Sequence, residues 1–291
     1  MINVLDRASD KTQPTAHWDT LAQSYFAMGS PLMPCAEDTA AMSQFIAQTN
    51  AAAGNRGVNA LMWGVTPAIA NLPWPTGSHL LAVDRSTAML AQVWPGDIPS
   101  QRTSKWGEWL DPKVDQHAYD VVIGDGSFNC LEYPTQYHQL AAVTRRALQP
   151  DGVLIARFFV KPANPETVDT VFDAALRGQI GSFHAFKWRL FMAVLGEQAT
   201  NIAVRDVRNV WMQANLDHAQ LLRVTGWPAT FLKSFDHYEH SDARYSFPSL
   251  AQVQESLATL FLCDQVYTPT YELGERCPIV VFRPKQIARD R

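Results

Sequence analysis

The residue of this 291-residue chain that is best suited to ligand chemistry is Asp84, an acid that directly follows the apolar run 80–83. About twenty residues earlier, a second apolar run ends at Trp63 and leads into a turn that begins with Gly64. A strand, a glycine turn, a short helix and a second strand that ends in a carboxylate are typical of a nucleoside-binding βαβ unit. Because the carboxylate can accept hydrogen bonds from both ribose hydroxyls, the sequence predicts a nucleoside site at Asp84.

Residues 59–160 alternate between apolar runs and helical patterns. The predicted strands in this region are 59–63, 79–83, 102–106, 119–123 and 153–160. Nearly continuous apolar strands separated by helices indicate a parallel sheet that is covered on both faces. Right-handed crossovers place the carboxyl ends of such strands on one edge, where ligands bind. Gly64, Asp84, Glu108 and Asp125 each follow a predicted strand, so we expect them to converge on that edge.

The segments on either side of this region have a different character. The spacing of apolar residues predicts a helix over 37–53, and the aromatic-rich stretch before it, 17–34, is expected to be irregular. This stretch either covers a ligand pocket or packs beneath the domain. Residues 162–261 have mainly helical patterns, and 263–267 and 278–283 are predicted to form an antiparallel pair of strands.

Together these patterns predict an α/β fold with a Rossmann-like, mostly parallel seven-stranded sheet and an antiparallel C-terminal strand. An N-terminal helical cap precedes the sheet, and a helical insertion precedes the last two strands. The predicted units are a cap segment (1–57), a ligand-binding core (58–161 and 262–285) and a mainly helical substrate-recognition elaboration (162–261).

The composition indicates a globular protein and excludes several classes. Hydrophobic residues make up 47% of the chain and charged residues 18%, which excludes a disordered chain. The net charge of -4 gives no general attraction to nucleic acid or to anionic lipid. Since no run approaches the roughly 20 apolar residues of a membrane span, and residues 1–15 lack the apolar core of a signal peptide, we expect a cytoplasmic protein. The wide spacing of the four cysteines favours reduced thiols over a disulfide framework or a metal site.

Three segments of the predicted core carry patterns more specific than that of a general nucleotide fold. They are 82–89 (Ala-Val-Asp-Arg-Ser-Thr-Ala-Met), 107–109 (Gly-Glu-Trp) and 119–128 (Tyr-Asp-Val-Val-Ile-Gly-Asp-Gly-Ser-Phe). With the antiparallel pair at the end, the chain resembles the class I S-adenosylmethionine-dependent methyltransferases over about 59–160 and 262–283. In that family the three segments bind the ribose, hold the adenine and lie beside the reactive sulfonium. The resemblance implies S-adenosyl-L-methionine as the cofactor.

The resemblance also implies which residues bind the cofactor. They are Gly64, Val65, Thr66, Asp84, Arg85, Met89, Gly107, Glu108, Trp109, Asp125, Gly126 and Ser127. Glu108 would accept a hydrogen bond from the adenine amine, and the backbone N–H of Trp109 would meet a ring nitrogen. Asp125 would bind the amino group of the methionine moiety. The first loop departs from the family pattern, because it keeps only Gly64 where two or three glycines are usual.

Simple structural explanations compete with these roles. Asp84 could be an acid that favours the N-terminus of the following helix through the macrodipole. Glu108 could be an exposed loop acid, and the Asp-Gly-Ser stretch at 125–127 is typical of turns. Met89 could pack in the core instead of against adenosine.

No residue stands out as a catalytic base. Methyl transfer mainly requires that a nucleophile is aligned with an already reactive sulfonium, so a base is needed only for an acceptor that holds its proton tightly. His17, Tyr133 and His138 are candidates by position, although a structural role is favoured for each. Arg157 interrupts an apolar strand near its carboxyl end, where a charge must be paired with an acid of the fold or with a ligand.

Two features of the helical region concern ligands. Residues 236–240 (Asp-His-Tyr-Glu-His) include metal-ligand types, but their polar surroundings favour a solvated loop over a metal site. Over 187–223 basic residues outnumber acids, which indicates an anionic small molecule. The basic residues are Lys187, Arg189, Arg205, Arg208 and Arg223, and the acids are Glu197, Asp206 and Asp217.

The sequence thus predicts a methyltransferase that acts on a small-molecule acceptor, with no nucleic-acid or membrane partner and no metal. An NAD-dependent oxidoreductase is the first alternative, although residues 64–69 lack the Gly-x-Gly-x-x-Gly pattern that holds a pyrophosphate. A cofactor-binding protein without catalytic activity is the second alternative, because the first loop is poor in glycine.

Overall fold

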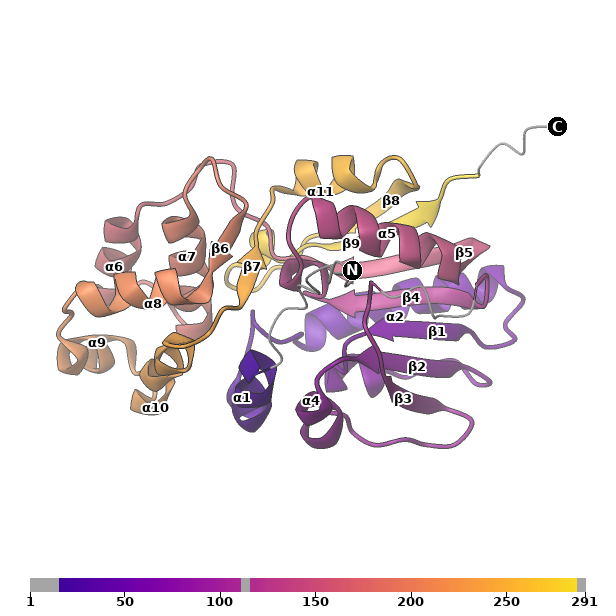
Figure 1. Ribbon diagram of the computed structural model, residues 1–291, viewed down its shortest axis with the longest axis horizontal. Helices are drawn as coiled ribbons and strands as arrows, with labels where there is room; N and C mark the ends of the chain where they lie inside the picture. The colour runs from indigo at the N-terminus through magenta and orange to yellow at the C-terminus, as the bar shows by residue number, and fades with distance from the viewer. Residues whose placement is uncertain (1–15, 111–115, 287–291) are drawn as a thin grey trace, which may run out of the picture.

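The computed structural model describes residues 16–110 and 116–286. Seven strands form one sheet in the order β3-β2-β1-β4-β5-β9-β8 (Figure 1). The strands are β1 (Asn59–Trp63), β2 (His79–Asp84), β3 (Arg102–Trp106), β4 (Tyr119–Asp125), β5 (Leu148–Arg157), β8 (Phe261–Tyr267) and β9 (Ile279–Pro284). The first five are parallel, whereas β9 runs antiparallel to both β5 and β8. The predicted α/β fold with its antiparallel C-terminal strand is therefore confirmed.

One strand begins earlier than predicted. A strand was expected over 153–160, but β5 spans Leu148–Arg157 and already pairs with β4 at Leu148, opposite Tyr119. The register then shifts between Tyr119 and Val121, so the intervening residues form an irregularity inside the ladder instead of a separate turn.

The register of the strands aligns their carboxyl ends. Trp63 lies opposite both Val83 and Gly124, so β1 ends level with β2 and β4. Asp84 lies opposite Trp106, and Asp125 lies opposite Arg157. The expected convergence of the strand-end loops on one edge of the sheet is confirmed.

Helices cover both faces of this sheet. One face carries α2 (Ala36–Ala52), α3 (Pro67–Ala70) and α4 (Thr87–Gln92), and the other carries α5 (Thr135–Ala147) and α11 (Leu250–Leu257). Helix α2 confirms the helix predicted over 37–53, since Met42, Phe45 and Ile46 are buried against the sheet. Its first turn is closed by a hydrogen bond from the Cys35 N–H to the Asp38 carboxylate at 2.9 Å.

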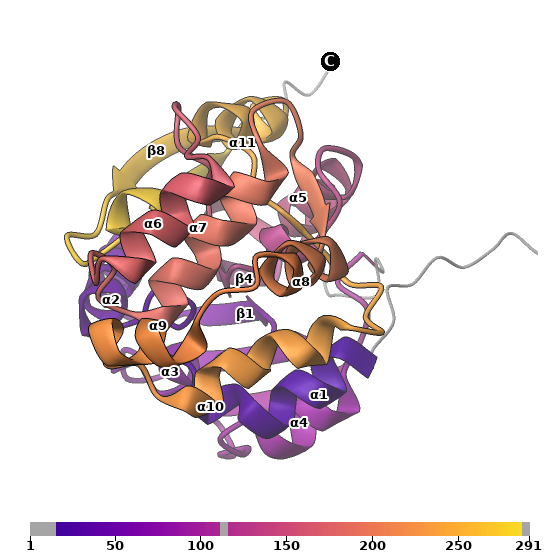
Figure 2. The same ribbon diagram turned by 90° about the vertical axis from the view of Figure 1, so that its left-hand side faces the viewer.

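The aromatic-rich stretch near the N-terminus is helical over 16–27 and irregular over 28–35, so the expected irregular lead-in is found only in its second part. Helix α1 (Ala16–Ser24) continues into a 3₁₀ turn, η1 (Tyr25–Ala27). It lies beside α4 (Figure 2), where the Ser86 hydroxyl donates to Asp19 at 3.0 Å. Because α1 buries little apolar surface of its own, these tertiary contacts stabilise a helix that its sequence pattern does not indicate.

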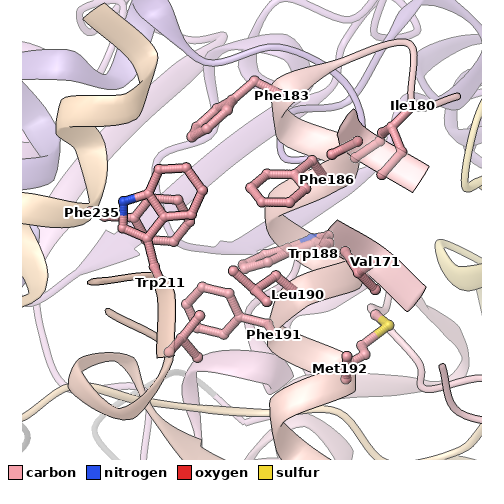
Figure 3. Packing of buried hydrophobic residues seen from close by; sticks show 14 of the residues in the cluster. Val171, Ile180, Phe183, Phe186, Trp188, Leu190, Phe191, Met192, Trp211 and Phe235 are labelled. Carbon is pink, nitrogen blue, oxygen red and sulfur yellow. The ribbon is translucent and has the colours of Figure 1, made fainter. Parts of the chain in front are cut away.

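A second group of helices lies beyond the carboxyl edge of the sheet, on the left of Figure 1. Its members are α6 (Val168–Leu176), α7 (Phe183–Leu195), α8 (Val204–Gln213), α9 (His218–Thr225), α10 (Ala229–Leu232) and the 3₁₀ turn η3 (Lys233–Tyr238). They enclose an aromatic core of their own, in which Trp211 and Phe235 stack at 4.9 Å and Phe186 meets Trp211 at 5.7 Å (Figure 3). A small sheet of β6 (Asn201–Ala203) and β7 (Arg244–Ser246) was not predicted, because strands this short have no readable period.

Among the described residues, no helix has the length and apolar character that crossing a membrane requires.

Candidate functional site

A cavity of about 560 Å³ lies between the carboxyl edge of the sheet, helix α1 and the helical group. Eleven of the twelve sequence-predicted residues line it: Gly64, Val65, Thr66, Asp84, Arg85, Met89, Glu108, Trp109, Asp125, Gly126 and Ser127. They come from the loops after β1, β2, β3 and β4, which the sheet brings to one place. Gly107 is not part of the wall, because it packs against the sheet, where an added Cβ would lie 3.0 Å from Val83 Cγ1.

Asp84 lies at the end of β2 on the cavity wall and is 8% exposed. Its carboxylate accepts a hydrogen bond from the Ser86 N–H at 2.9 Å and another from the Arg85 backbone. Burial raises the pKa of Asp84 to about 6, although these backbone hydrogen bonds and the Arg85 charge oppose the shift. The carboxylate makes no side-chain hydrogen bond within residues 16–110 and 116–286. The Asp84 carboxylate is therefore a buried hydrogen-bond acceptor that faces the cavity.

The carboxylate of Asp84 should lower the stability of the folded protein at neutral pH. Since the pKa of Asp84 is raised to about 6 in the folded state, the folded chain binds more protons than the unfolded chain between about pH 4 and 6. Stability is therefore lost as the pH rises through this window. We expect Asp84→Asn to raise the free energy of unfolding by about 1–2 kcal/mol at pH 7.5 and by much less at pH 4. Urea unfolding at both pH values measures this difference, and an equal effect at both would contradict it.

The loops after β1 and β3 meet across the end of β2. Gly64 has a φ of +100°, a conformation that favours glycine. The indole Nε1 of Trp109 donates to the Val83 carbonyl at 2.7 Å, which lays the ring across the strand end beside Gly64. The ring of Trp109, and not only its backbone, thus forms part of the wall. Beside it, the Glu108 carboxylate lies 3.6 Å from the Arg85 guanidinium.

Arg157 is paired with acids of the fold, which agrees with the structural alternative for this residue. It is 1% exposed, and its Nε contacts Asp125 Oδ1 at 2.6 Å, while Nη1 contacts Asp38 Oδ2 at 3.0 Å. Tyr271 bridges Arg157 and Asp38, since its hydroxyl lies 3.1 Å from Arg157 Nη1 and 3.0 Å from Asp38 Oδ1. The guanidinium therefore fixes Asp125 at the cavity wall and ties α2 to the sheet.

The turn after β4 is tightly packed. Gly126 has a φ of +60°, and an added Cβ there would lie 2.7 Å from the Phe159 ring, so a larger residue does not fit. The neighbouring Ser127 hydroxyl is buried and has no hydrogen-bond partner in the part of the chain that the structure describes. Its oxygen packs against Gly124, where an added Cβ would lie 2.3 Å away, so it is buried in the turn and is not open to the cavity.

Much of the remaining wall comes from two parts of the chain outside the strand-end loops. Six residues belong to the N-terminal segment: Trp18, Leu21, Tyr25, Met28, Leu32 and Met33. Lys187, Trp188 and Tyr238 belong to the helical group, and Tyr245 belongs to β7. Tyr25 lies over the first loop, where its hydroxyl bonds to Thr66 and burial raises its pKa well above the ordinary value. The aromatic richness of 17–34 was the one signal for this cover, and the cavity-lining role of Trp18 and Tyr25 agrees with it.

Three of the catalytic candidates lie away from the main cavity. His17 is buried with both ring nitrogens occupied, one by the Tyr245 hydroxyl at 3.0 Å and the other by Ser241 Oγ at 3.1 Å. Burial, and then the charge of Lys187, lowers the pKa of His17 to about 4. The Tyr133 hydroxyl donates to the Gln252 carbonyl at 3.3 Å, and His138 is exposed on α5. The two hydrogen bonds of His17 therefore hold α1 against the segment that contains Ser241 and Tyr245.

The polar stretch 236–240 is only partly solvated. Asp236, His237, Glu239 and His240 are exposed, whereas Tyr238 is buried and lines the cavity. Within residues 16–110 and 116–286, no group of three or more histidine, cysteine or acidic side chains is arranged to hold a metal ion.

Comparisons with known proteins were made in three ways. No protein-family model matches the chain, and no curated protein matches its sequence. Solved structures do match it at low identity. A candidate zinc-dependent alcohol dehydrogenase from Rhodobacter sphaeroides has a TM-score of 0.61 at 11% identity, over 94% of this chain and 99% of that one.

Two methyltransferase structures match to a similar extent. The CcbJ methyltransferase from Streptomyces caelestis has a TM-score of 0.53 at 13% identity, over 93% of this chain and 98% of that one. The CurJ carbon methyltransferase has a TM-score of 0.51 at 12% identity, over 94% of this chain and 60% of that one. At such identities the likeness concerns the fold. With β9 antiparallel between β5 and β8, the chain has the Rossmann-like fold of the class I S-adenosylmethionine-dependent methyltransferases.

Proposed function

We propose that this protein is an S-adenosylmethionine-dependent methyltransferase that acts on a small molecule. The observation that carries this proposal is the meeting of Asp84, Glu108 and Asp125 at one cavity on the carboxyl edge of the sheet. These acids follow three different strands, so their meeting is a property of the fold rather than of one loop. The acid at the end of β2 is suited to a ribose diol.

The residues present fit this cofactor. The Asp84 carboxylate faces the cavity as an acceptor for two hydroxyls, and Asp125 and Gly126 lie on the wall of the same cavity. Trp18 and Tyr25 line the same cavity, and aromatic rings are suited to a positively charged sulfur. When bound, S-adenosylmethionine supplies a methyl group on that sulfur.

The chain's own contribution to the reaction is alignment and exclusion of water. The strand-end loops would fix the nucleoside through Asp84, Glu108 and Asp125. The aromatic and methionine side chains of the N-terminal segment would close the cavity above it and displace water. In such a site most of the rate enhancement comes from holding the acceptor in line with the methyl group.

Calorimetry tests the cofactor assignment directly. We expect S-adenosylhomocysteine to bind the purified protein and NAD to bind at least tenfold more weakly. The absence of the Gly-x-Gly-x-x-Gly loop and the antiparallel β9 both argue against an NAD-dependent oxidoreductase, whose sheet is parallel in the order 3-2-1-4-5-6. Preference for NAD would overturn the proposal.

A binding protein without catalytic activity is the second candidate. It is favoured by one observation, that His17, Tyr133 and His138 all lie away from the main cavity wall. Turnover of S-adenosylmethionine with a panel of acceptors separates the two functions. Tight binding of S-adenosylhomocysteine without turnover on any acceptor would favour the binding protein.

A further inference from the structure

Lys187 is a buried cation at the junction of two cavities. It lies in the first half of α7, is 5% exposed, and lines both the main cavity and a smaller one of about 220 Å³. Its Nζ lies 3.3 Å from Ser234 Oγ and 4.6 Å from the centre of the Tyr238 ring. The Phe235 ring lies 5.5 Å from Nζ.

Lys187 is buried without an acidic partner, whereas the other basic residues of the helical group either pair with an acid or are exposed. Arg189 pairs with Glu166, Arg205 pairs with Asp242 and Arg208 pairs with Glu239, and Arg223 is exposed to solvent. Among the residues that the structure describes, no carboxylate lies within ion-pair distance of Lys187. Lys187 is therefore a buried amine on a cavity wall whose charge the described part of the chain does not balance.

The groups around this amine do not supply a negative charge. His17 from α1, His184 from α7, and His237 and Tyr238 from η3 are its titratable neighbours. Burial, followed by the charge of Lys187, lowers the pKa of His184 to about 4, and burial lowers the pKa of Lys187 to about 7. An ammonium group in such a position gains most from an anion that enters the cavity.

The other side chains of the cavity wall indicate what kind of molecule would bear the anionic group. Trp18, Trp188 and Tyr245 present aromatic surface beside Lys187, and Leu21 and Met28 continue it as aliphatic surface. These side chains are suited to an aromatic or otherwise apolar body, which leaves the amine as the polar group that fixes its orientation.

We propose that Lys187 is the acceptor-recognition residue, and that the methyl acceptor is a small, largely aromatic molecule whose carboxylate forms an ion pair with Nζ. This inference rests on the proposed function and names its substrate class. The carboxylate would lie at the junction of the cavities, and the aromatic body would extend along the apolar wall toward the loops of the sheet.

The first test compares acids with their amides, which have nearly the same shape. Protein loaded with S-adenosylhomocysteine is titrated with benzoate, salicylate, 4-hydroxybenzoate and indole-3-acetate, and with the amide of each. We expect at least one acid to bind tenfold or more tightly than its amide. The Lys187→Met variant should lose this preference, and Lys187→Arg should keep part of it. Arg223→Met, which removes an exposed cation of the same helical group, serves as the matched control and should keep all of it.

The second test uses the unaltered protein and does not depend on how a variant folds. Since the pKa of Lys187 is lowered to about 7, about nine-tenths of the amine is neutral at pH 8. Binding of a carboxylate should then take up nearly one proton per ligand at pH 8 and almost none at pH 6. Calorimetry in two buffers of different ionisation enthalpy measures this uptake.

The outcomes separate this inference from the function on which it rests. If S-adenosylhomocysteine does not bind, the proposed function fails. If it binds but no acid of the panel is preferred over its amide, or the preference survives in Lys187→Met, the assignment of Lys187 alone is overturned. Acid binding without proton uptake at pH 8 would also overturn it.

Discussion

Replacing Arg157 by methionine is expected to lower the free energy of unfolding by about 3–5 kcal/mol at neutral pH. The guanidinium holds Asp38 and Asp125, which come from α2 and β4 and are both largely buried. Methionine fills similar space but leaves two buried carboxylates close together without a cation. Urea unfolding at pH 7.5 measures the loss, and failure of the variant to fold would agree with it.

An exposed ion pair provides the control. Arg177 pairs with Asp173 at 3.3 Å on the surface of α6, where both side chains are more than half exposed. Arg177→Met should change the free energy of unfolding by less than about 0.5 kcal/mol. The deficit of Arg157→Met should also shrink as the pH falls, because the stranded carboxylates then bind protons. A loss below about 1 kcal/mol at pH 7.5 would mean that the buried network contributes little.

The largest effect on ligand binding is expected for Asp84→Ala. Removing an acceptor that bonds two ribose hydroxyls should weaken binding of S-adenosylhomocysteine by about 1–3 kcal/mol, or roughly fivefold to 150-fold. The same substitution removes a costly buried carboxylate, so the variant should fold at least as well as the original chain. Calorimetry gives the affinity, and thermal melting gives the stability.

If replacing a residue raises the stability of the protein but weakens ligand binding, the role of that residue is to bind the ligand. Asp169→Ala, which removes an exposed acid from the first turn of α6, should leave the affinity unchanged. Unchanged affinity in Asp84→Ala would remove Asp84 from the site, and equal losses in both variants would point to a general charge effect.

The sheet and its loops could be predicted because their information is local. Each apolar run is bounded by a turn residue, and parallel strands must place Gly64, Asp84 and Asp125 on one edge. The helix at 36–52 was equally readable, since Met42, Phe45 and Ile46 recur at helical spacing.

What could not be predicted depends on contacts between distant residues. Asp38 and Arg157 are 119 positions apart, so the sequence showed only that Arg157 needed a partner and not which one. Lys187 reads as a surface cation in an apolar helix, and only the packing of η3 against α7 buries it. Helix α1 forms because it docks on α4 and the helical group, through Asp19 and His17, rather than because of its own pattern.

The place of β9 in the sheet has a consequence for biosynthesis. This strand is hydrogen-bonded on both sides, to β5 and to β8, yet it is the last strand of the described chain to leave the ribosome. Until residues 279–284 emerge, the inner edges of β5 and β8 stay unpaired, and Val280 and Phe282 are missing from the apolar layer that they complete. The nascent chain therefore carries an open β-edge while residues 158–279 are synthesised, which makes this the stage at which chaperone protection matters most.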